Sequence, residues 1–297
     1  MEAVQLKLEN NLPDNIKKLY PFTSNYFELI SGHKMHFVEE GNGAPILMVH
    51  GNPTWSIFYR KLINEFKSTN RVIVPDHIGS GLSDKPQDYE YTLKNHIDNL
   101  EALVKKLNLK NITLVVHDWG GAIGMGYAGR NPENVKNIVI LNTAAFRSTE
   151  LPWRIGLCKI PVIGEGLIRI FNAFSLLGTY MAVEKPMSED VRQAFVYPYN
   201  NFKNRIGNAR FVQDIPLNPE HPSYKTLIEV EENLKKLKCP KYIIWGAKDF
   251  CFTLNFFEKW KQIYPNAKTK VFENAGHYLL EDAGEEITQE IKEFIKV

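Results

Sequence analysis

The chain has 297 residues, of which 44% are hydrophobic and 24% are charged, and its formal net charge is +2. This is the composition of a globular protein, long enough for one large α/β domain with an insertion. The Lys and Arg residues are scattered, with no basic block beyond short pairs such as Lys105-Lys106, so we expect no nucleic-acid partner.

The cysteines and the apolar runs indicate the cellular compartment. Cys158, Cys239 and Cys251 form no CxxC pair and no metal-binding spacing, which is typical of a protein from a reducing compartment. The first 15 residues are polar and mixed in charge, unlike a signal peptide. No run of 18 apolar residues occurs, so we expect no membrane span. We therefore expect a cytoplasmic protein that holds no metal ion and no cofactor.

Strands and helices alternate in the first half of the chain. Residues 1–20 are predicted to be a solvent-exposed lead-in, and strands at 27–30 and 34–39 flank the turn Ser31-Gly32-His33. The continuous apolar run at 46–50 predicts a strand buried on both faces. Further along we expect a helix at 57–66, a strand at 71–75, a helix at 92–107, a strand from Leu114, a helix ending near Gly129 and a strand at 135–142. This order predicts a mostly parallel central sheet with helices on both faces.

The pattern changes after Asn142. Residues 143–223 contain candidate helices at 163–174, 188–196 and 201–214 but no convincing strand. We interpret them as a helical cap inserted into an α/β core formed by residues 1–142 and 224–297. The aromatic side chains of the cap either fill its core or line a pocket, and the sequence leaves this open. Strands at 241–245 and 270–273 and helices at 254–264 and 285–295 complete the core.

The segment HDWGG at 117–121 follows three apolar strand residues and precedes a helix. This pattern is typical of a nucleophile elbow, whose middle residue is exposed above the edge of the sheet. That residue is Asp118 rather than Ser, and a carboxylate nucleophile suits displacement at saturated carbon. The alternative is that Asp118 only caps the following helix. Gly120 and Gly121 would let that helix pass close to the turn.

Two more reactive side chains follow predicted strands, Asp249 after 241–245 and His277 after 270–273. The chain order of nucleophile, acid and histidine is that of the α/β-hydrolase fold. In a parallel sheet the carboxyl ends of the strands share one edge, where ligands bind. We therefore predict that Asp118, Asp249 and His277 form a catalytic triad. Taken singly, Asp249 fits a turn or helix cap equally well, and His277 fits a surface loop.

Asn52 and Trp119 are the candidate residues for binding an anion. In the α/β-hydrolase fold, the backbone N–H groups of the residue after the nucleophile and of a residue in the first strand loop form the oxyanion hole. Here these residues are Trp119 and Asn52, and their side chains also carry N–H donors that can bind a leaving anion. The alternatives are that Asn52 forms a turn before Pro53 and that Trp119 only packs.

The segments HGNPTW at 50–55, PDHIGSGLSDKP at 75–86 and HDWGG at 117–121 resemble the haloalkane dehalogenase group, over nearly the whole chain. The resemblance implies an aspartate that displaces halide from carbon and a histidine that activates water against the resulting ester. Carried over, these are Asp118 and His277, and Asn52 and Trp119 hold the halide. Many members have a helper Glu where this chain has Asn142, so Asp249 becomes the predicted acid.

A narrower resemblance links DHIG at 76–79, LNTAAF at 141–146, RFVQDIPL at 210–217 and DFCF at 249–252 to the β-lactone decarboxylases of bacterial long-chain olefin biosynthesis. It implies conversion of a hydrophobic cis-β-lactone to a cis-alkene and CO₂, with other enzymes of the olefin pathway as partners. The alternatives are a haloalkane dehalogenase, a catalytically silent ligand receptor, and an epoxide hydrolase that uses cap tyrosines among Tyr180, Tyr197, Tyr199 and Tyr224. A serine esterase is disfavoured because the elbow has no Ser.

Overall fold

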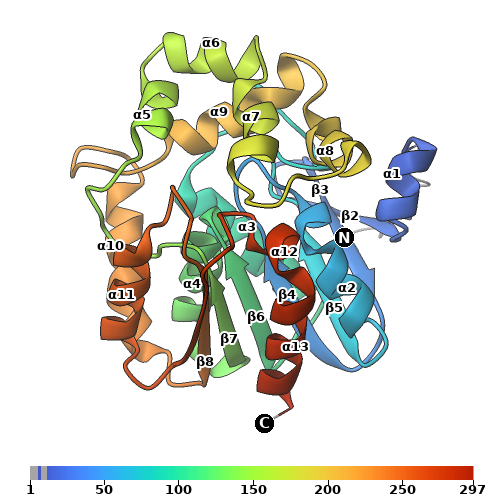
Figure 1. The fold of residues 1–297 in the computed structure, drawn as a ribbon, viewed down its shortest axis with the longest axis vertical. Helices are drawn as coiled ribbons and strands as arrows, with labels where there is room; N and C mark the ends of the chain where they lie inside the picture. The colour runs from blue at the N-terminus through green and yellow to red at the C-terminus, as the bar shows by residue number, and fades with distance from the viewer. Residues whose placement is uncertain (1–5, 8–11, 297) are drawn as a thin grey trace.

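The computed structural model describes residues 6–7 and 12–296. Within these residues, nine strands form one sheet in the order β1-β2-β3-β5-β4-β6-β7-β8-β9 (Figure 1). The strands are β1 (Leu6–Lys7), β2 (Ser24–Glu28), β3 (Lys34–Glu40), β4 (Ala44–Val49), β5 (Asn70–Pro75), β6 (Ile112–His117), β7 (Val135–Leu141), β8 (Lys241–Gly246) and β9 (Lys268–Phe272).

The sheet is mostly parallel, as predicted. β1, β2 and β3 pair in antiparallel fashion, and β3 joins β5 antiparallel, whereas all strands from β5 to β9 in the sheet order are parallel. In this register Val49 pairs with Val116, and Leu141 pairs with both His117 and Ile244. The carboxyl ends of β4, β6, β7 and β8 therefore lie at one edge of the sheet.

Helices cover both faces of the sheet because the central strands are apolar on both sides. One buried cluster packs the sheet against α3 (Leu93–Lys106), α4 (Trp119–Arg130), α10 (Tyr224–Asn233) and α11 (Leu254–Ile263). The other packs it against α1 (Asp14–Leu19), α2 (Arg60–Phe66), α12 (Leu279–Asp282) and α13 (Gly284–Ile295). The predicted α/β-hydrolase fold class is thus confirmed.

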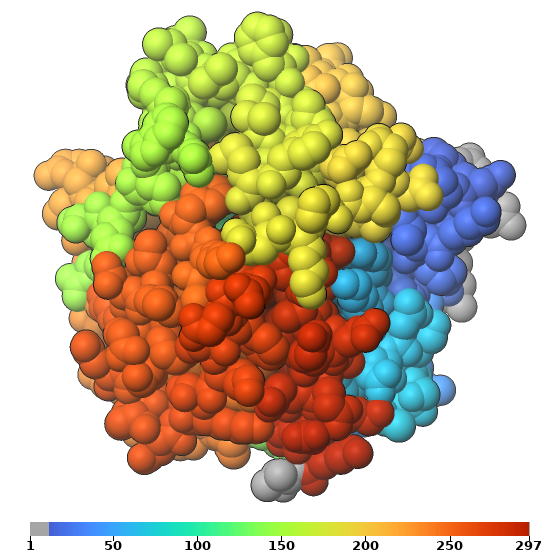
Figure 2. Space-filling view, in the orientation of Figure 1, coloured from blue at the N-terminus to red at the C-terminus, as the bar shows by residue number. Residues whose placement is uncertain are grey.

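The cap lies between β7 and β8. It contains α5 (Trp153–Lys159), α6 (Ile163–Arg169), α7 (Ala173–Met181), α8 (Glu189–Val196) and α9 (Ile206–Gln213). In Figures 1 and 2 these helices form the end of the molecule that lies over the strand ends, away from the C-terminus. The described residues between Leu141 and Lys241 contain no strand. Domain boundaries at 143 and 223 remain a prediction.

The structure corrects the predicted lead-in. Residues 12–20 are exposed on one side only: Leu12, Ile16 and Tyr20 are buried, since a spacing of four places them on one face of the segment that includes α1. Residues Leu6–Lys7 belong to the sheet as β1. Residues 1–5 and 8–11 of the predicted lead-in lie outside the described residues.

Some helix boundaries also differ from the prediction. The expected helix at 163–174 is divided, because Asn172 has a left-handed conformation with φ of 55° and separates α6 from α7. The expected helix at 201–214 is regular only in α9. Helices α5, α10 and α12 were not predicted. No helix of the described residues is both long and apolar enough to cross a membrane.

Candidate active site

Asp118 stands at the turn between β6 and α4. Its backbone has φ of 51° and ψ of −128°, a conformation that non-glycine residues adopt rarely and mainly at functional sites. Its side chain makes no capping hydrogen bond to α4, which argues against a purely structural helix-cap role. Instead, the carboxylate oxygen Oδ1 accepts a hydrogen bond of 2.6 Å from the backbone N–H of Asn52.

Two glycines let the loops approach Asp118 closely. A Cβ atom at Gly51 would lie 2.0 Å from Asp118 Oδ1, and one at Gly120 would lie 1.9 Å from the carbonyl oxygen of Val49. Both positions therefore exclude any larger residue unless the backbone shifts. The predicted close passage of α4 is seen at Gly120, and the need for glycine at position 51 was not anticipated.

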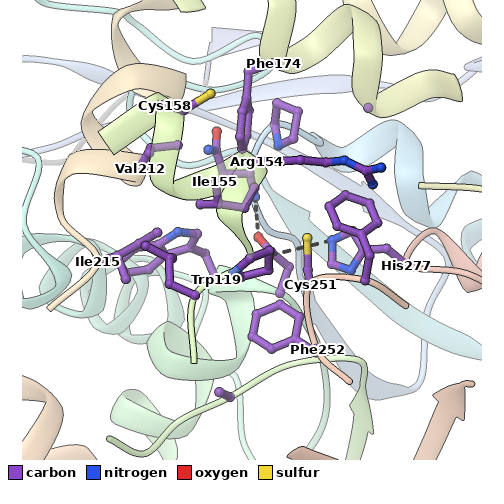
Figure 3. A pocket seen from close by; sticks show the side chains of 18 of the residues that line it. Trp119, Arg154, Ile155, Cys158, Phe174, Val212, Ile215, Cys251, Phe252 and His277 are labelled. Atoms are coloured by element: carbon purple, nitrogen blue, oxygen red, sulfur yellow. Dashed lines mark hydrogen bonds and ion pairs between the residues drawn. The ribbon is translucent and has the colours of Figure 1, made fainter. Parts of the chain in front are cut away.

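The structure brings together all three residues of the predicted triad, from the ends of β6, β8 and β9. His277 Nδ1 lies 2.8 Å from Asp249 Oδ2, within hydrogen-bonding distance. His277 Nε2 lies 3.7 Å from Asp118 Oδ2 on the other side of the ring. Figure 3 shows His277 next to Cys251 in the pocket, and Phe252 also lines it. The imidazole is thus placed between two carboxylates.

Asp249 is held by donors that the sequence did not reveal. Asn142 Nδ2 donates to Asp249 Oδ2 over 2.8 Å. The backbone N–H groups of Cys251 and Phe252 donate to the other oxygen, Oδ1, over 2.6 and 3.1 Å. Asn142 therefore contacts the acid rather than the histidine. Its position after β7, where the resemblance to dehalogenases implies a helper acid, was the only signal in the sequence.

The charges of the triad residues depend on one another. Burial raises the pKa of Asp118, and nearby His277 and the backbone N–H groups of Trp119 and Asn52 offset only part of that rise. Burial by itself lowers the pKa of His277, but the Asp249 and Asp118 carboxylates raise it on balance above its ordinary value. A protonated His277 is therefore stabilised next to an ionised Asp118.

The predicted anion donors, Asn52 and Trp119, both line the cavity at Asp118. The Asn52 side chain donates from Nδ2 to the backbone carbonyl of Asn208 on α9 over 3.3 Å. Among the described residues, the Trp119 indole N–H has no hydrogen-bond acceptor, and its ring packs against Phe211 with 5.3 Å between ring centroids. The indole N–H is thus free to bind an incoming group. The Asn52 amide, in contrast, must release the Asn208 carbonyl or donate to both acceptors.

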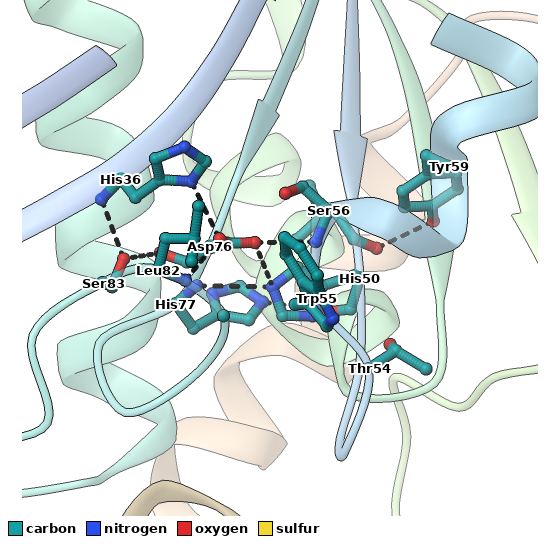
Figure 4. Close-up of polar contacts among 12 residues, drawn as sticks. His36, His50, Thr54, Trp55, Ser56, Tyr59, Asp76, His77, Leu82 and Ser83 are labelled. Atoms are coloured by element: carbon teal, nitrogen blue, oxygen red, sulfur yellow. Dashed lines mark hydrogen bonds and ion pairs between the residues drawn. The ribbon is translucent and has the colours of Figure 1, made fainter. Parts of the chain in front are cut away.

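A buried polar cluster behind the Asn52 loop escaped sequence reasoning (Figure 4). Asp76 accepts hydrogen bonds from His36 Nδ1 at 2.8 Å and from the backbone N–H of Ser56 at 2.7 Å, and His50 Nε2 lies 3.7 Å away. Burial tends to raise the pKa of Asp76, but His36, His50 and the Leu82 N–H lower it on balance. The cluster ties β3 and β5 to the loop that carries the Asn52 N–H.

A cavity of about 470 Å³ opens above Asp118. Asn52, Asp118, Trp119 and His277 form its polar floor, and nearly all other lining residues are apolar. The core contributes Ala122, Ala144, Phe146, Leu227, Phe250, Phe252 and Phe256, and the cap contributes Leu151, Ile155, Leu167, Phe174, Val212, Ile215 and Leu217, among others. Such a site suits a hydrophobic small molecule whose reacting carbon reaches the floor.

The cap aromatics are divided between these roles. Trp153 and Phe174 line the cavity, whereas Phe195, Tyr199 and Phe211 are buried in the protein core. None of the four cap-region tyrosines considered for an epoxide hydrolase, Tyr180, Tyr197, Tyr199 and Tyr224, lines the cavity. The structure thus provides no tyrosine pair from the cap that could activate an epoxide oxygen.

One group of potential metal ligands overlaps the triad. The ligand atoms of Asp249, Cys251 and His277 lie within 4.8 Å of one another, a proximity that cysteine spacing did not predict. The facing atoms of Asp249 and His277 already lie 2.8 Å apart. Burial raises the pKa of the Cys251 thiol well above its ordinary value, which opposes the thiolate that metals require. The arrangement fits a triad better than a metal centre.

Comparison with known proteins places this geometry in a family. The family model of the α/β hydrolase fold matches residues 44–284. The chain is 50% identical to a cis-3-alkyl-4-alkyloxetan-2-one decarboxylase of Shewanella oneidensis, over 93% of this chain and 89% of the relative. It is 32% identical to a haloalkane dehalogenase of Mycolicibacterium paratuberculosis, over 92% of each chain. The crystal structure of the haloalkane dehalogenase DatA from Agrobacterium tumefaciens C58 matches with a TM-score of 0.81 and 26% identity, covering 92% of this chain and 96% of that one.

The chain therefore belongs to the α/β-hydrolase fold family. Within that family it is an enzyme of the haloalkane dehalogenase-like group, and its resemblance to the β-lactone decarboxylases is confirmed.

Proposed function

We propose that this enzyme decarboxylates cis-β-lactones with two long alkyl chains to cis-alkenes. The observation that carries the proposal is a single buried carboxylate, Asp118, at the polar floor of a cavity whose walls are mostly apolar. The name of the Shewanella relative supports it, because an oxetan-2-one is a β-lactone and 3,4-dialkyl groups are its two chains. The apolar walls would accommodate the chains, and the polar floor would accommodate the lactone ring.

In the first step, Asp118 Oδ2 attacks the saturated ring carbon that is bonded to the ring oxygen, not the carbonyl carbon. The C–O bond of the ring breaks, its electron pair goes to oxygen, and a free carboxylate results while an alkyl-aspartyl ester forms. Asp118 Oδ1, held by the Asn52 N–H at 2.6 Å, becomes the carbonyl oxygen of that ester. The side-chain N–H groups of Asn52 and Trp119 stabilise the carboxylate that leaves.

In the second step, the new carboxylate is lost as CO₂. The electrons of its C–C bond form the double bond, and the ester C–O bond breaks to return the Asp118 carboxylate, so no proton and no water are consumed. Attack from the face opposite the ring oxygen places the aspartyl oxygen and the carboxylate on opposite sides of the C–C bond. Loss of both groups from that arrangement retains the cis relation of the alkyl chains, which gives a cis-alkene.

In this reaction His277 acts on charge rather than on water. Asp118 must be ionised to attack, yet burial raises its pKa. Protonated His277, held by Asp249 at 2.8 Å, favours the ionised form from 3.7 Å away. Its role is thus to keep the nucleophile charged inside an apolar cavity.

Haloalkane dehalogenation is the second candidate function. The side-chain N–H groups of Trp119 and Asn52 beside Asp118, which support binding of a leaving carboxylate, favour it as well, because they would stabilise a leaving halide in the same way. In that reaction neutral His277 would act as the base for water that cleaves the ester. Other enzymes of an olefin pathway as partners remain a prediction in either case.

The two functions are separated by product analysis. The enzyme is incubated in parallel with a long-chain cis-β-lactone and with 1,2-dibromoethane, and alkene, β-hydroxy acid and bromide are measured. The proposal predicts alkene and CO₂ from the lactone, with little β-hydroxy acid, and at most slow bromide release. Dominant β-hydroxy acid, or turnover of the haloalkane alone, would replace it with the dehalogenase function.

A further inference from the structure

Most of the exposed apolar side chains of this protein are gathered on the cap. Of the 14 large hydrophobic side chains that are exposed among the described residues, only Ile30 and Leu254 lie elsewhere. The others are Trp153, Leu157, Ile160, Val162, Ile163, Ile170, Phe171, Leu176, Leu177, Tyr180, Met181 and Phe202. A concentration of exposed apolar side chains on one part of a protein marks a site of interaction with proteins or membranes.

These side chains belong mainly to three neighbouring helices. α6 packs against both α5 and α7, and together the three helices form the outermost part of the cap in Figures 1 and 2. We call the exposed part of residues 151–181 the cap surface. Within it, α6 lies at the end of the molecule opposite α13 and the C-terminus in Figure 1.

The cap surface is continuous with the active-site cavity. Trp153, Leu157, Leu177 and Met181 are exposed to solvent and also line the cavity. A hydrophobic molecule can therefore pass from the cap surface to the cavity along apolar side chains. Ile163 and Phe171 are also exposed, by 59% and 69%, but they do not line the cavity.

The charges on the cap surface favour an anionic partner. Residues 151–181 contain three cationic side chains, Arg154, Lys159 and Arg169, against one carboxylate, Glu165. Of the three, only Arg154 is fully on the surface, because Arg169 is buried and Lys159 Nζ donates to the backbone carbonyls of α9 and the loop after it. Glu165 is paired with Arg169 at 2.5 Å. The exposed Arg154 has no carboxylate partner among the described residues, and its guanidinium lies over the rings of Trp153 and Phe250. A cation beside an exposed Trp is suited to the headgroup region of a bilayer.

We propose that the cap surface docks on an anionic lipid bilayer and opens the cavity toward the acyl chains. Its apolar side chains would enter the boundary between headgroups and chains, while Arg154 binds lipid phosphate. The route assigned to the substrate rests on the proposed function, because a lactone with two long chains resides in lipid rather than in water. The docking itself rests on the exposed apolar side chains and on the unpaired charge of Arg154.

Vesicle flotation tests the docking. Wild-type protein is mixed with vesicles of phosphatidylcholine, alone or with about one third phosphatidylglycerol, and the bound fraction is measured. The test variant is Ile163→Glu with Phe171→Glu, and the matched control is Ile30→Glu, at a fully exposed site on the core. Removing two apolar side chains that would be buried in the bilayer should weaken partitioning roughly 10²-fold. Wild type and the Ile30→Glu control should bind anionic vesicles equally.

Tryptophan fluorescence gives an independent readout. Trp153 is exposed, Trp119 is partly buried in the cavity, and Trp55, Trp245 and Trp260 are fully buried, so brominated lipid should quench wild-type emission more strongly than emission of the Trp153→Phe variant. Failure of wild type to bind anionic vesicles would overturn the proposal. Concentration-dependent oligomers that disappear in the Ile163→Glu and Phe171→Glu variant would then assign the surface to a second copy of the chain.

Activity on a water-soluble, short-chain β-lactone without vesicles separates this inference from the proposed function. The Ile163→Glu and Phe171→Glu variant should match wild type in that assay, which also shows that it is folded. Vesicle binding without any lactone turnover by wild type would overturn the proposed function and leave the docking supported. Lactone turnover without vesicle binding would do the reverse.

Discussion

Asn142 and His277 contact the same oxygen of Asp249, each over 2.8 Å. Because Oδ2 is shared, the amide of Asn142 fixes the carboxylate for the imidazole but cannot balance the charge of a protonated imidazole. Asp249→Asn should therefore reduce turnover strongly, by roughly 10²-fold or more, and Asn142→Ala only mildly. Steady-state kinetics with either substrate class measures the ranking. The reverse ranking would show that the helper role belongs to the residue after β7 and not to Asp249.

Replacement of the nucleophile should abolish chemistry but not binding. Asp118→Asn keeps the size of the side chain and an oxygen that can accept from the Asn52 backbone N–H, but an amide is not a nucleophile. We expect substrate binding with no turnover of lactone or haloalkane. Intact mass must show that the new Asn has not deamidated to Asp, and clear turnover by protein that passes this check would exclude Asp118.

The leaving-anion donors should act on the first step. Losing one preorganised donor typically slows a reaction roughly 10² to 10³-fold, so Asn52→Ala should slow formation of the Asp118 ester far more than it weakens binding. Rapid-quench single-turnover kinetics resolves the two effects. Asn137→Ala, which removes a buried amide on β7 away from the cavity, serves as the control. Unchanged ester formation in Asn52→Ala would remove this residue from the chemistry.

The pH dependence should distinguish the two candidate reactions. Burial raises the pKa of Asp118 above its ordinary value of 3.8, so both reactions should slow as pH falls through that raised pKa and the carboxylate becomes protonated. The two carboxylates raise the pKa of His277 above 6.5 despite its burial. Dehalogenation needs neutral His277 and should accelerate as pH rises through this pKa. Lactone decarboxylation should show no such acceleration, and kcat profiles over both ranges measure the difference.

Much of the site could be predicted because each reactive residue follows its own strand. A parallel sheet brings strand ends to one edge, so the local patterns at Asp118, Asp249 and His277 were enough to place them together. The partners of these residues could not be predicted in the same way. Asn142 and Asp249 are 107 positions apart, and only the packed structure shows which strand-end side chains touch.

The errors in the fold have physical reasons as well. The segment containing α1 appears polar when read residue by residue, yet Leu12, just before the helix, and Ile16, within it, both pack into the core. The cap helices were hard to delimit because their apolar residues occur on several faces, including faces exposed to solvent. Periodicity alone therefore gives no clear boundary between α6 and α7.

Turnover in H₂¹⁸O tests the central claim, decarboxylation without water, most directly. If water cleaves the ester, it attacks the carbonyl carbon and leaves ¹⁸O in the Asp118 carboxylate; loss of CO₂ returns the original oxygens. After multiple turnovers of a long-chain cis-β-lactone, the peptide that contains Asp118 is analysed by mass spectrometry alongside the products. Our account predicts alkene with an unlabelled Asp118. An Asp118 that gains ¹⁸O while β-hydroxy acid accumulates would contradict it.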